Sequence, residues 1–168
     1  MSNFSFRISG HSEEEIMISL KLVKDSFGIT DIASKSYYQW QYMQNPVGQG
    51  TVLLAYQDGE PAGQFACIPC RYKYTTEDLV VPLTLNLCVL SKFRGRGLMS
   101  QLITTMHSYL ENEHKFSIGV PNQESIKGHL YLNYTLFLFV QSAVDNGRNY
   151  LRKDLWESHD FQLCYKHK

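Results

Sequence analysis

The chain has 168 residues, of which 43% are apolar and 13% aromatic, and its 16 basic and 16 acidic side chains give a formal net charge of zero. This length and apolar content predict a single domain, over residues 1–168, with a sizeable core. The balanced charge argues against a protein that binds nucleic acid or an anionic membrane. No apolar run reaches the roughly 18–20 residues of a membrane span. The N-terminal residues also lack the pattern of a signal peptide, so we expect a soluble, cytoplasmic protein.

The N-terminal residues predict a strand followed by a helix. The strand is expected over 4–9. Ser12 is a typical helix N-cap, Glu15 stands at the third helical position of a capping box, and apolar residues follow at helical spacing. An aromatic segment over 37–43, closed by Pro46, is typical of a short core helix that proline ends. The alternative for this segment is substrate contact from one of three residues, Tyr37, Tyr38 and Trp40.

A β-hairpin is predicted next. Residues 51–56 form a strand, Asp58-Gly59 stands at the centre of a turn, and residues 62–70 form the returning strand. Residues 72–81 are expected to extend that strand and to turn at 77–78.

Cys67 and Cys70 form a Cys-x-x-Cys motif within the returning strand. A redox motif of this kind begins a helix, and a zinc site needs further ligands, whereas Cys88 and Cys164 stand alone. We therefore expect ordinary reduced cysteines and no metal site.

The most informative stretch is a strand, a basic turn and a helix in succession. Residues 83–89 alternate apolar and polar positions, residues 92–97 read Lys-Phe-Arg-Gly-Arg-Gly, and a helix is expected over 98–112. Glycines let a backbone approach a ligand closely, and the free N–H groups at a helix N-terminus attract anions. The turn therefore predicts a phosphate-binding site.

This arrangement resembles the GNAT superfamily of N-acetyltransferases, whose signature is Gln/Arg-x-x-Gly-x-Gly/Ala. Lys92 stands where that family has Gln or Arg, and Ser91 stands where Pro is common. A second similarity lies in Gly119 to Ser125, followed by Asn133 in place of a usual glycine, and Asn also tolerates the left-handed C-cap. Together with Asn45-Pro46-Val47-Gly48, it resembles a subgroup often associated with cell-surface sugar biosynthesis. The resemblance covers residues 37–134.

The alternation of helix and strand signals predicts an α/β protein with helices on both faces of a central sheet. The resemblance implies that the sheet is mixed but mostly antiparallel, and that its strands four and five splay apart. The remaining elements expected are a helix over 125–132, a short helical or irregular segment over 150–156, and strands over 115–120, 135–143 and 161–165. The apolar strand over 136–140 could pair across a homodimer.

The resemblance also implies an acetyl-CoA-dependent N-acetyltransferase in which a small-molecule amine, such as an amino sugar, attacks the thioester directly in a ternary complex. Acetyl-CoA would be a co-substrate, with its pyrophosphate on the loop and its pantetheine along strand four. The residues implied to bind it are Leu87, Cys88, Val89, Arg94, Gly95, Arg96, Gly97, Leu98, Asn122 and Ser125. Asn122 has a second interpretation, as the N-cap of the following helix.

Proton transfer is where the chain departs from the family pattern. Asn86 stands where many relatives have an acidic general base, and an amide cannot accept that proton. His129 stands at the position of the family's general-acid Tyr, and histidine titrates near neutral pH. An exposed helix histidine is the other interpretation of His129, with Tyr131 and Tyr134 as alternative acids. Glu124 is a weaker candidate base.

Two other functions remain open from the sequence. A CoA-binding or protein-interaction module with degraded catalysis is consistent with Asn86 and with the departures at Ser91 and Lys92. RNA binding through Arg-Gly-Arg-Gly is opposed by the zero net charge and the single basic cluster. A covalent route through Cys88 as nucleophile is the less favoured chemistry.

Overall fold

The computed structural model describes residues 3–28, 31–74, 76–114 and 116–120, together with the C-terminal strands 135–139, 142–145, 148–151 and 162–167. The predicted helix over 125–132 lies outside the described residues. So do six of the candidate residues: Asn122, Glu124, Ser125, His129, Tyr131 and Tyr134.

Within the described residues, seven strands form one sheet in the order β1-β2-β3-β4-β5-β9-β6. The strands are β1 (Ser5–Ile8), β2 (Thr51–Gln57), β3 (Glu60–Tyr74), β4 (Glu77–Val89), β5 (Phe116–Gly119), β6 (Thr135–Phe139) and β9 (Gln162–His167). Neighbouring strands run antiparallel except β4 and β5, which are parallel. The prediction of a mixed, mostly antiparallel sheet is confirmed.

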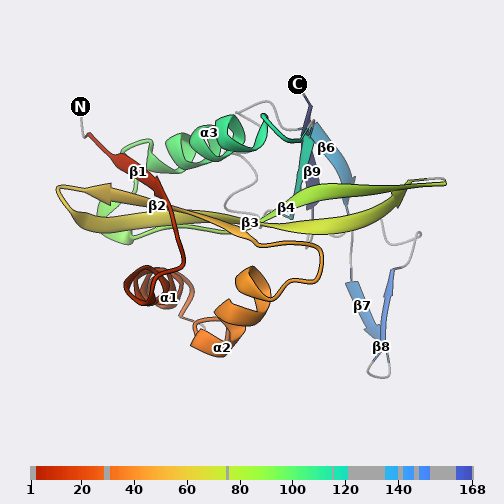
Figure 1. Ribbon diagram of the computed structural model, residues 1–168, viewed down its shortest axis with the longest axis horizontal. Helices are drawn as coiled ribbons and strands as arrows, with labels where there is room; N and C mark the ends of the chain where they lie inside the picture. Colours follow the sequence, from red (N-terminus) through yellow and green to blue (C-terminus); the bar gives the residue numbers. More distant parts are fainter. Residues whose placement is uncertain are drawn as a thin grey trace.

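Helices cover both faces of the sheet, as predicted (Figure 1). The helix α1 (Glu13–Phe27) and the short α2 (Lys35–Tyr38) lie on one face, and α3 (Leu98–Leu110) lies on the other. A π-helical turn, η1 (Gln39–Met43), continues α2, and a 3₁₀ turn, η2 (Ser91–Phe93), follows β4. No helix in the described part of the chain is both long and apolar enough to cross a membrane.

The start of α1 is fixed by the capping box that the sequence predicts. The Ser12 hydroxyl accepts the backbone N–H of Glu15 at 3.3 Å, and the Glu15 carboxylate accepts the backbone N–H of Ser12 at 3.1 Å. Both contacts satisfy N–H groups that have no partner inside the helix. The helix ends at Gly28, whose φ of 64° is the left-handed conformation of a helix C-cap.

Each face of the sheet buries its own apolar core. Against α3 the core joins the helix residues Leu98, Leu102, Ile103 and Met106 to sheet residues such as Phe65 and Leu53. Against α1, α2 and η1 it joins Ile16, Leu20, Tyr38 and Tyr42 to Val52, Leu54, Ala66 and Cys88. The alternation of side chains along β2 and β3 explains this division, because successive strand residues point to opposite faces.

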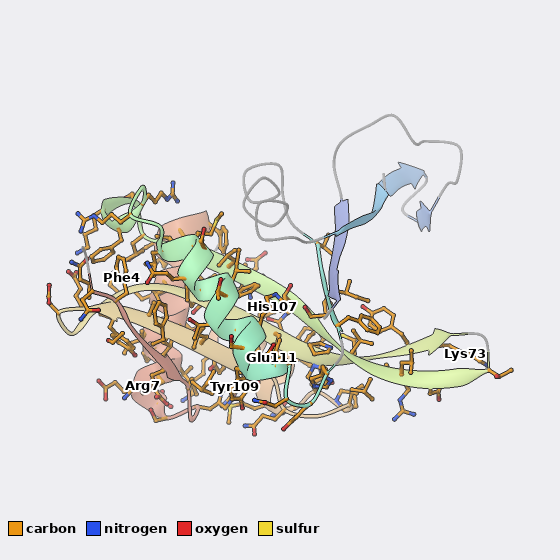
Figure 2. The ribbon with its side chains drawn as sticks, turned by 90° about the horizontal axis from the view of Figure 1, so that it is seen from above. Phe4, Arg7, Lys73, His107, Tyr109 and Glu111 are labelled. Atoms are coloured by element: carbon orange, nitrogen blue, oxygen red, sulfur yellow. The ribbon has the colours of Figure 1, made fainter. Side chains whose placement is uncertain are left out.

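The β2–β3 hairpin turns where predicted, at Asp58 and Gly59, which both have positive φ (52° and 81°). The β3–β4 hairpin is longer than predicted, since Tyr74 pairs with Glu77 and the charged residues at 77–78 belong to β4. Figure 2 shows this hairpin reaching out to Lys73, beyond the helices.

Two C-terminal predictions differ from the structure. The strand expected over 135–143 is divided into β6 and a separate β7 (Ser142–Asp145). Residues 150–151, expected to be helical or irregular, belong to β8 (Arg148–Leu151). The cause is local pairing, because β7 and β8 form a small antiparallel hairpin of their own. The last strand, expected over 161–165, is confirmed as β9.

The strands β4 and β5 separate along their length. They pair only at Leu83 with Ile118 and at Thr84 with Gly119. There β5 ends, while β4 continues to Val89. In the described residues, the β4 edge from Leu85 to Val89 therefore has no partner on the β5 side, and the predicted splay is confirmed.

Candidate functional site

A cavity of about 430 Å³ lies where α1 ends, β4 ends and α3 begins. Its wall includes Ser26 and Phe27 from α1 and Met99 and Ser100 from α3. It also includes seven of the residues that the sequence singled out: Leu87, Cys88, Val89, Arg94, Gly95, Gly97 and Leu98. The cavity opens beside the part of β4 that has no β5 partner.

The loop between β4 and α3 contributes Gly95 and Gly97 to the cavity wall, and the first residue of α3 contributes Leu98. Gly95 and Gly97 both have positive φ (73° and 76°), a conformation that glycine adopts without steric cost. Gly97 is the N-cap of α3, and no side chain caps the helix. The first turn of α3 also carries no acidic side chain. The free N–H groups and the positive end of the helix dipole therefore form a site suited to an anion.

The three basic side chains of the loop have different partners. Arg94, which lines the cavity, donates from Nε to the carbonyl oxygen of Val89 at 3.1 Å. Lys92 forms an ion pair with Glu60, and Arg96 donates to Gln57 Oε1 at 3.2 Å. Arg94 is thus the basic side chain at the cavity wall, whereas Lys92 and Arg96 contact the β2–β3 hairpin.

Asn86, at the expected position of a general base, lies in a β-bulge. Ala66 pairs with Leu85 and Gln64 pairs with Cys88, so two residues of β4 stand opposite one residue of β3. Asn86 has a φ of 49°, and its Nδ2 donates to the Tyr42 hydroxyl at 2.6 Å.

Sequence reasoning missed this bulge. The available signal was an asparagine within an apolar strand, because asparagine is enriched among non-glycine residues with positive φ.

Gly63 allows β3 to approach β4 beside the bulge. A Cβ at Gly63 would lie 2.6 Å from the carbonyl oxygen of Cys88, closer than atoms can approach. A glycine is therefore required at this position by the close approach of two backbones.

Cys67 and Cys88 are buried thiols, whereas Cys70 is partly exposed. Cys88 is 5% exposed, and burial raises the pKa of its thiol to about 11, although the Ser26 hydroxyl opposes that shift. Burial likewise raises the pKa of Cys67 to about 11 and raises that of Cys70. Cys67 and Cys70 are free thiols in β3. The described residues contain no cluster of three or more side chains able to hold a metal ion.

The aromatic segment divides into a buried part and an exposed part. Tyr38 and Tyr42 are 1% and 2% exposed, and the Tyr38 hydroxyl lies 2.8 Å from His11 Nδ1. Trp40 is 61% exposed and contacts the ring of Tyr37. The structure thus places Tyr38 in the core and leaves Tyr37 and Trp40 as the candidates for substrate contact.

A family model described as "Acetyltransferase (GNAT) domain" matches residues 7–134. A GNAT family acetyltransferase from Elizabethkingia anophelis, solved with acetyl-CoA bound, is 17% identical with a TM-score of 0.59, and the match covers 100% of both chains. An acyl-CoA N-acyltransferase from Pseudomonas aeruginosa is 11% identical with a TM-score of 0.64, covering 98% of this chain and 99% of that one. Escherichia coli ElaA is 11% identical with a TM-score of 0.64, covering 98% and 100%. No curated protein matches the chain.

Proposed function

Since the chain belongs to the acetyltransferase (GNAT) domain family, we propose that it binds acetyl-CoA as co-substrate in the cavity between α1, β4 and α3 and transfers the acetyl group to a small-molecule amine. The observation that carries this proposal is the uncapped N-terminus of α3 behind Gly95 and Gly97 at the cavity wall. The acetyl-CoA found in the Elizabethkingia protein supports the choice of ligand.

The pyrophosphate of acetyl-CoA occupies the loop. Backbone N–H groups of residues 95–98 bind its oxygens, whereas the backbone N–H of Arg94 already donates to the carbonyl of Ser91 at 3.2 Å. The Arg94 side chain adds a charge-assisted contact from the cavity wall. The Arg96 side chain is held by Gln57, so we assign to Arg96 a contact through its backbone N–H only.

The pantetheine arm lies along the free edge of β4. Leu87, Cys88 and Val89 line the cavity there, and the strand offers backbone groups that β5 does not use. Pairing with such an edge satisfies the amides of the arm in the manner of an added strand. We also assign Asn122 and Ser125 to the cofactor site, on the resemblance alone.

Acetyl-CoA would supply an activated carbonyl as its thioester. The protein must orient this carbonyl and stabilise its developing negative charge, while one proton leaves the amine and another reaches the departing thiolate. Neither Asn86, an amide, nor Cys88, a buried thiol, can act as the general base. The amine therefore loses its proton to water or to Glu124, the weaker candidate base, and His129, Tyr131 or Tyr134 protonates the departing thiolate. An amino sugar is the acceptor that the sugar-biosynthesis resemblance supports.

A second candidate function is a CoA-binding module without turnover. The observation that favours it is Asn86, whose amide occupies the position of the family's base and is engaged by Tyr42.

Thermal unfolding with and without acetyl-CoA tests the binding site. At a ligand concentration of about a hundred times its dissociation constant, the stabilisation is about 2.7 kcal/mol. For a domain of this size that is a rise of about 5–10 °C in midpoint. A variant with both Gly95→Ala and Gly97→Ala should fold and lose most of the rise. No rise for the unmodified protein at millimolar acetyl-CoA would refute the proposal.

Gly59→Ala is the matched control for backbone strain. Like Gly95, Gly59 has a positive φ and no atom within 4 Å of an added Cβ, but it lies in the β2–β3 turn outside the cavity. Gly59→Ala should lower the stability about as much as one of the two loop substitutions does. It should keep the rise in unfolding midpoint that acetyl-CoA causes. Release of free CoA in the presence of a panel of primary amines then separates a transferase from a binding module.

A further inference from the structure

The π-helical turn η1 directs Tyr42 toward the sheet. The N–H of Gln44 bonds to the carbonyl of Gln39 at 2.8 Å, a five-residue spacing that widens the turn. Tyr42 is 2% exposed, and its carbonyl accepts the N–H of Gly50 at 2.7 Å. A Cβ at Gly50 would come within 2.9 Å of the Tyr42 ring, so the ring is held closely against this loop. The backbone and the ring of Tyr42 are therefore both held in place, which fixes the position of its hydroxyl.

The partner of that hydroxyl is the strained residue of the β4 bulge. Asn86 Nδ2 donates to Tyr42 Oη at 2.6 Å, and Asn86 has a φ of 49°. Asparagine adopts a left-handed conformation more readily than other non-glycine residues, but within a strand this conformation persists only where its surroundings enforce it. The contact with Tyr42 is a local restraint of this kind.

The bulge lies at a functional position along β4. Its two residues that stand opposite one residue of β3, Asn86 and Leu87, begin two positions after Thr84, the last residue of β4 that pairs with β5. Leu87 also begins the part of β4 that lines the cavity. A bulge leaves backbone groups outside the ladder, and here they stand at the inner end of the proposed pantetheine groove.

We propose that Tyr42 is a positioning residue for acetyl transfer: its hydroxyl holds Asn86 in the left-handed conformation, and so holds the bulge where a backbone N–H of β4 receives the acetyl carbonyl. This inference rests on the proposed function. Tyr42 does not serve as the proton donor, because burial raises its pKa and a phenol of raised pKa is a poor acid for a departing thiolate.

The test compares the dissociation constants of acetyl-CoA and of CoA by calorimetry. CoA binds through the same loop and β4 edge but lacks the acetyl carbonyl, so the ratio of the two constants reports the carbonyl contact. Tyr42→Phe removes the hydroxyl alone. It should reduce the preference for acetyl-CoA by about fivefold to tenfold, equivalent to about one hydrogen bond, and leave the affinity for CoA unchanged.

Tyr38→Phe is the matched control. It removes another buried tyrosine hydroxyl from the same aromatic segment, but one that faces His11 instead of Asn86. Its ratio of dissociation constants should equal that of the unmodified protein.

Asn86→Gly provides a rescue. Glycine adopts positive φ without a restraint, so this variant should keep the preference for acetyl-CoA, and adding Tyr42→Phe to it should change nothing. Asn86→Ala removes the same amide but disfavours the left-handed conformation, and it should lose the preference. If Tyr42→Phe does not fold, the glycine and alanine pair still tests the step on which the inference depends, that the left-handed conformation at residue 86 sets the preference for acetyl-CoA.

The outcomes separate the two proposals. If the unmodified protein binds neither CoA nor acetyl-CoA, the proposed function fails. If it binds both equally, or if Tyr42→Phe keeps the preference, the assignment of Tyr42 is wrong. An equal loss of affinity for CoA and acetyl-CoA in Tyr42→Phe, or a loss in Asn86→Gly as large as in Asn86→Ala, would also overturn it.

Discussion

The Nε of Arg94 donates a hydrogen bond of 3.1 Å to the carbonyl oxygen of Val89, which closes the turn between β4 and α3. The contact holds the Arg94 side chain at the wall of the cavity, to which Gly97 and Leu98 at the start of α3 also belong. Arg96, two residues later, is instead held by Gln57. The Arg94 side chain is therefore placed to contact a phosphate in the cavity, whereas the Arg96 side chain is engaged elsewhere.

Replacing Arg94 should weaken cofactor binding more than replacing Arg96. We expect Arg94→Gln to raise the dissociation constant of acetyl-CoA by about tenfold or more, because a charge-assisted hydrogen bond contributes about 1.5–3 kcal/mol. Arg96→Gln should raise it by less than about threefold. Calorimetric titration at two salt concentrations checks this, and the Arg94 contribution should shrink at the higher one. A larger loss for Arg96→Gln would reverse the assignment of the two side chains.

Interactions within short segments made part of the fold, and part of the candidate site, predictable from the sequence. The capping box of Ser12 and Glu15, the Asp58-Gly59 turn and the glycines of the loop each depend on residues a few positions apart. Such features follow from propensity and hydrogen bonding within a short segment. The succession of strand, glycine-containing turn and helix around residues 92–98 was predictable for the same reason.

The contact between Tyr42 and Asn86 was beyond sequence reasoning. The two residues are 44 positions apart, and their contact depends jointly on a π-helical turn, a bulge and the packing of α2 against the sheet. The turn of the β3–β4 hairpin was also predicted at the wrong residues. Charged residues at 77–78 suggested a turn, whereas cross-strand pairing carries β4 through them.

Gly63→Ala should be strongly destabilising. The added methyl would meet the carbonyl oxygen of Cys88 at 2.6 Å, and a backbone atom cannot turn aside as a side chain can. We expect a loss of about 3 kcal/mol in the free energy of unfolding, at the upper end for overpacking, measured by urea denaturation.

Gly10→Ala is the control for Gly63→Ala, because its Cβ would meet its nearest neighbour at 3.7 Å, an ordinary contact. This variant should be within about 1 kcal/mol of the unmodified protein. Similar stabilities for the two variants would show that β3 and β4 can move apart at the bulge.

Cys88 should remain unacetylated and react slowly with alkylating reagents. Burial raises its pKa to about 11, so fewer than about one thiol in a thousand is ionised at pH 7.5. Iodoacetamide should label the partly exposed Cys70 before Cys88, and Cys67, with a similarly raised pKa, should match Cys88. Peptide mass spectrometry after incubation with acetyl-CoA checks the other half of the prediction. An acetyl adduct on Cys88 would establish a covalent route instead of direct attack.

Glu15 should make the stability of the protein depend on pH. Its Oε2 accepts hydrogen bonds from the backbone N–H groups of Ser12 and Gly10 at 3.1 and 3.0 Å, and Arg7 lies 3.2 Å from Oε1. Burial acts to raise the pKa of Glu15, but the hydrogen bonds from Ser12 and the charge of Arg7 outweigh it, so the pKa lies below its ordinary value of 4.5. The stabilisation is therefore fully present above about pH 4.5 and is lost as the pH falls through the lower, folded-state pKa.

Glu15→Gln should accordingly lower the free energy of unfolding by about 2 kcal/mol at pH 7. The difference from the unmodified protein should shrink at about pH 3, where the carboxylate of the unmodified protein is increasingly protonated. Glu14→Gln is the control, because it removes a neighbouring, exposed carboxylate from the same first turn of α1. Urea denaturation of the three proteins at both pH values measures the effect. A Glu15→Gln deficit that is the same at pH 7 and pH 3 would mean that shape and packing, and not the charge of the carboxylate, stabilise the corner between β1 and α1.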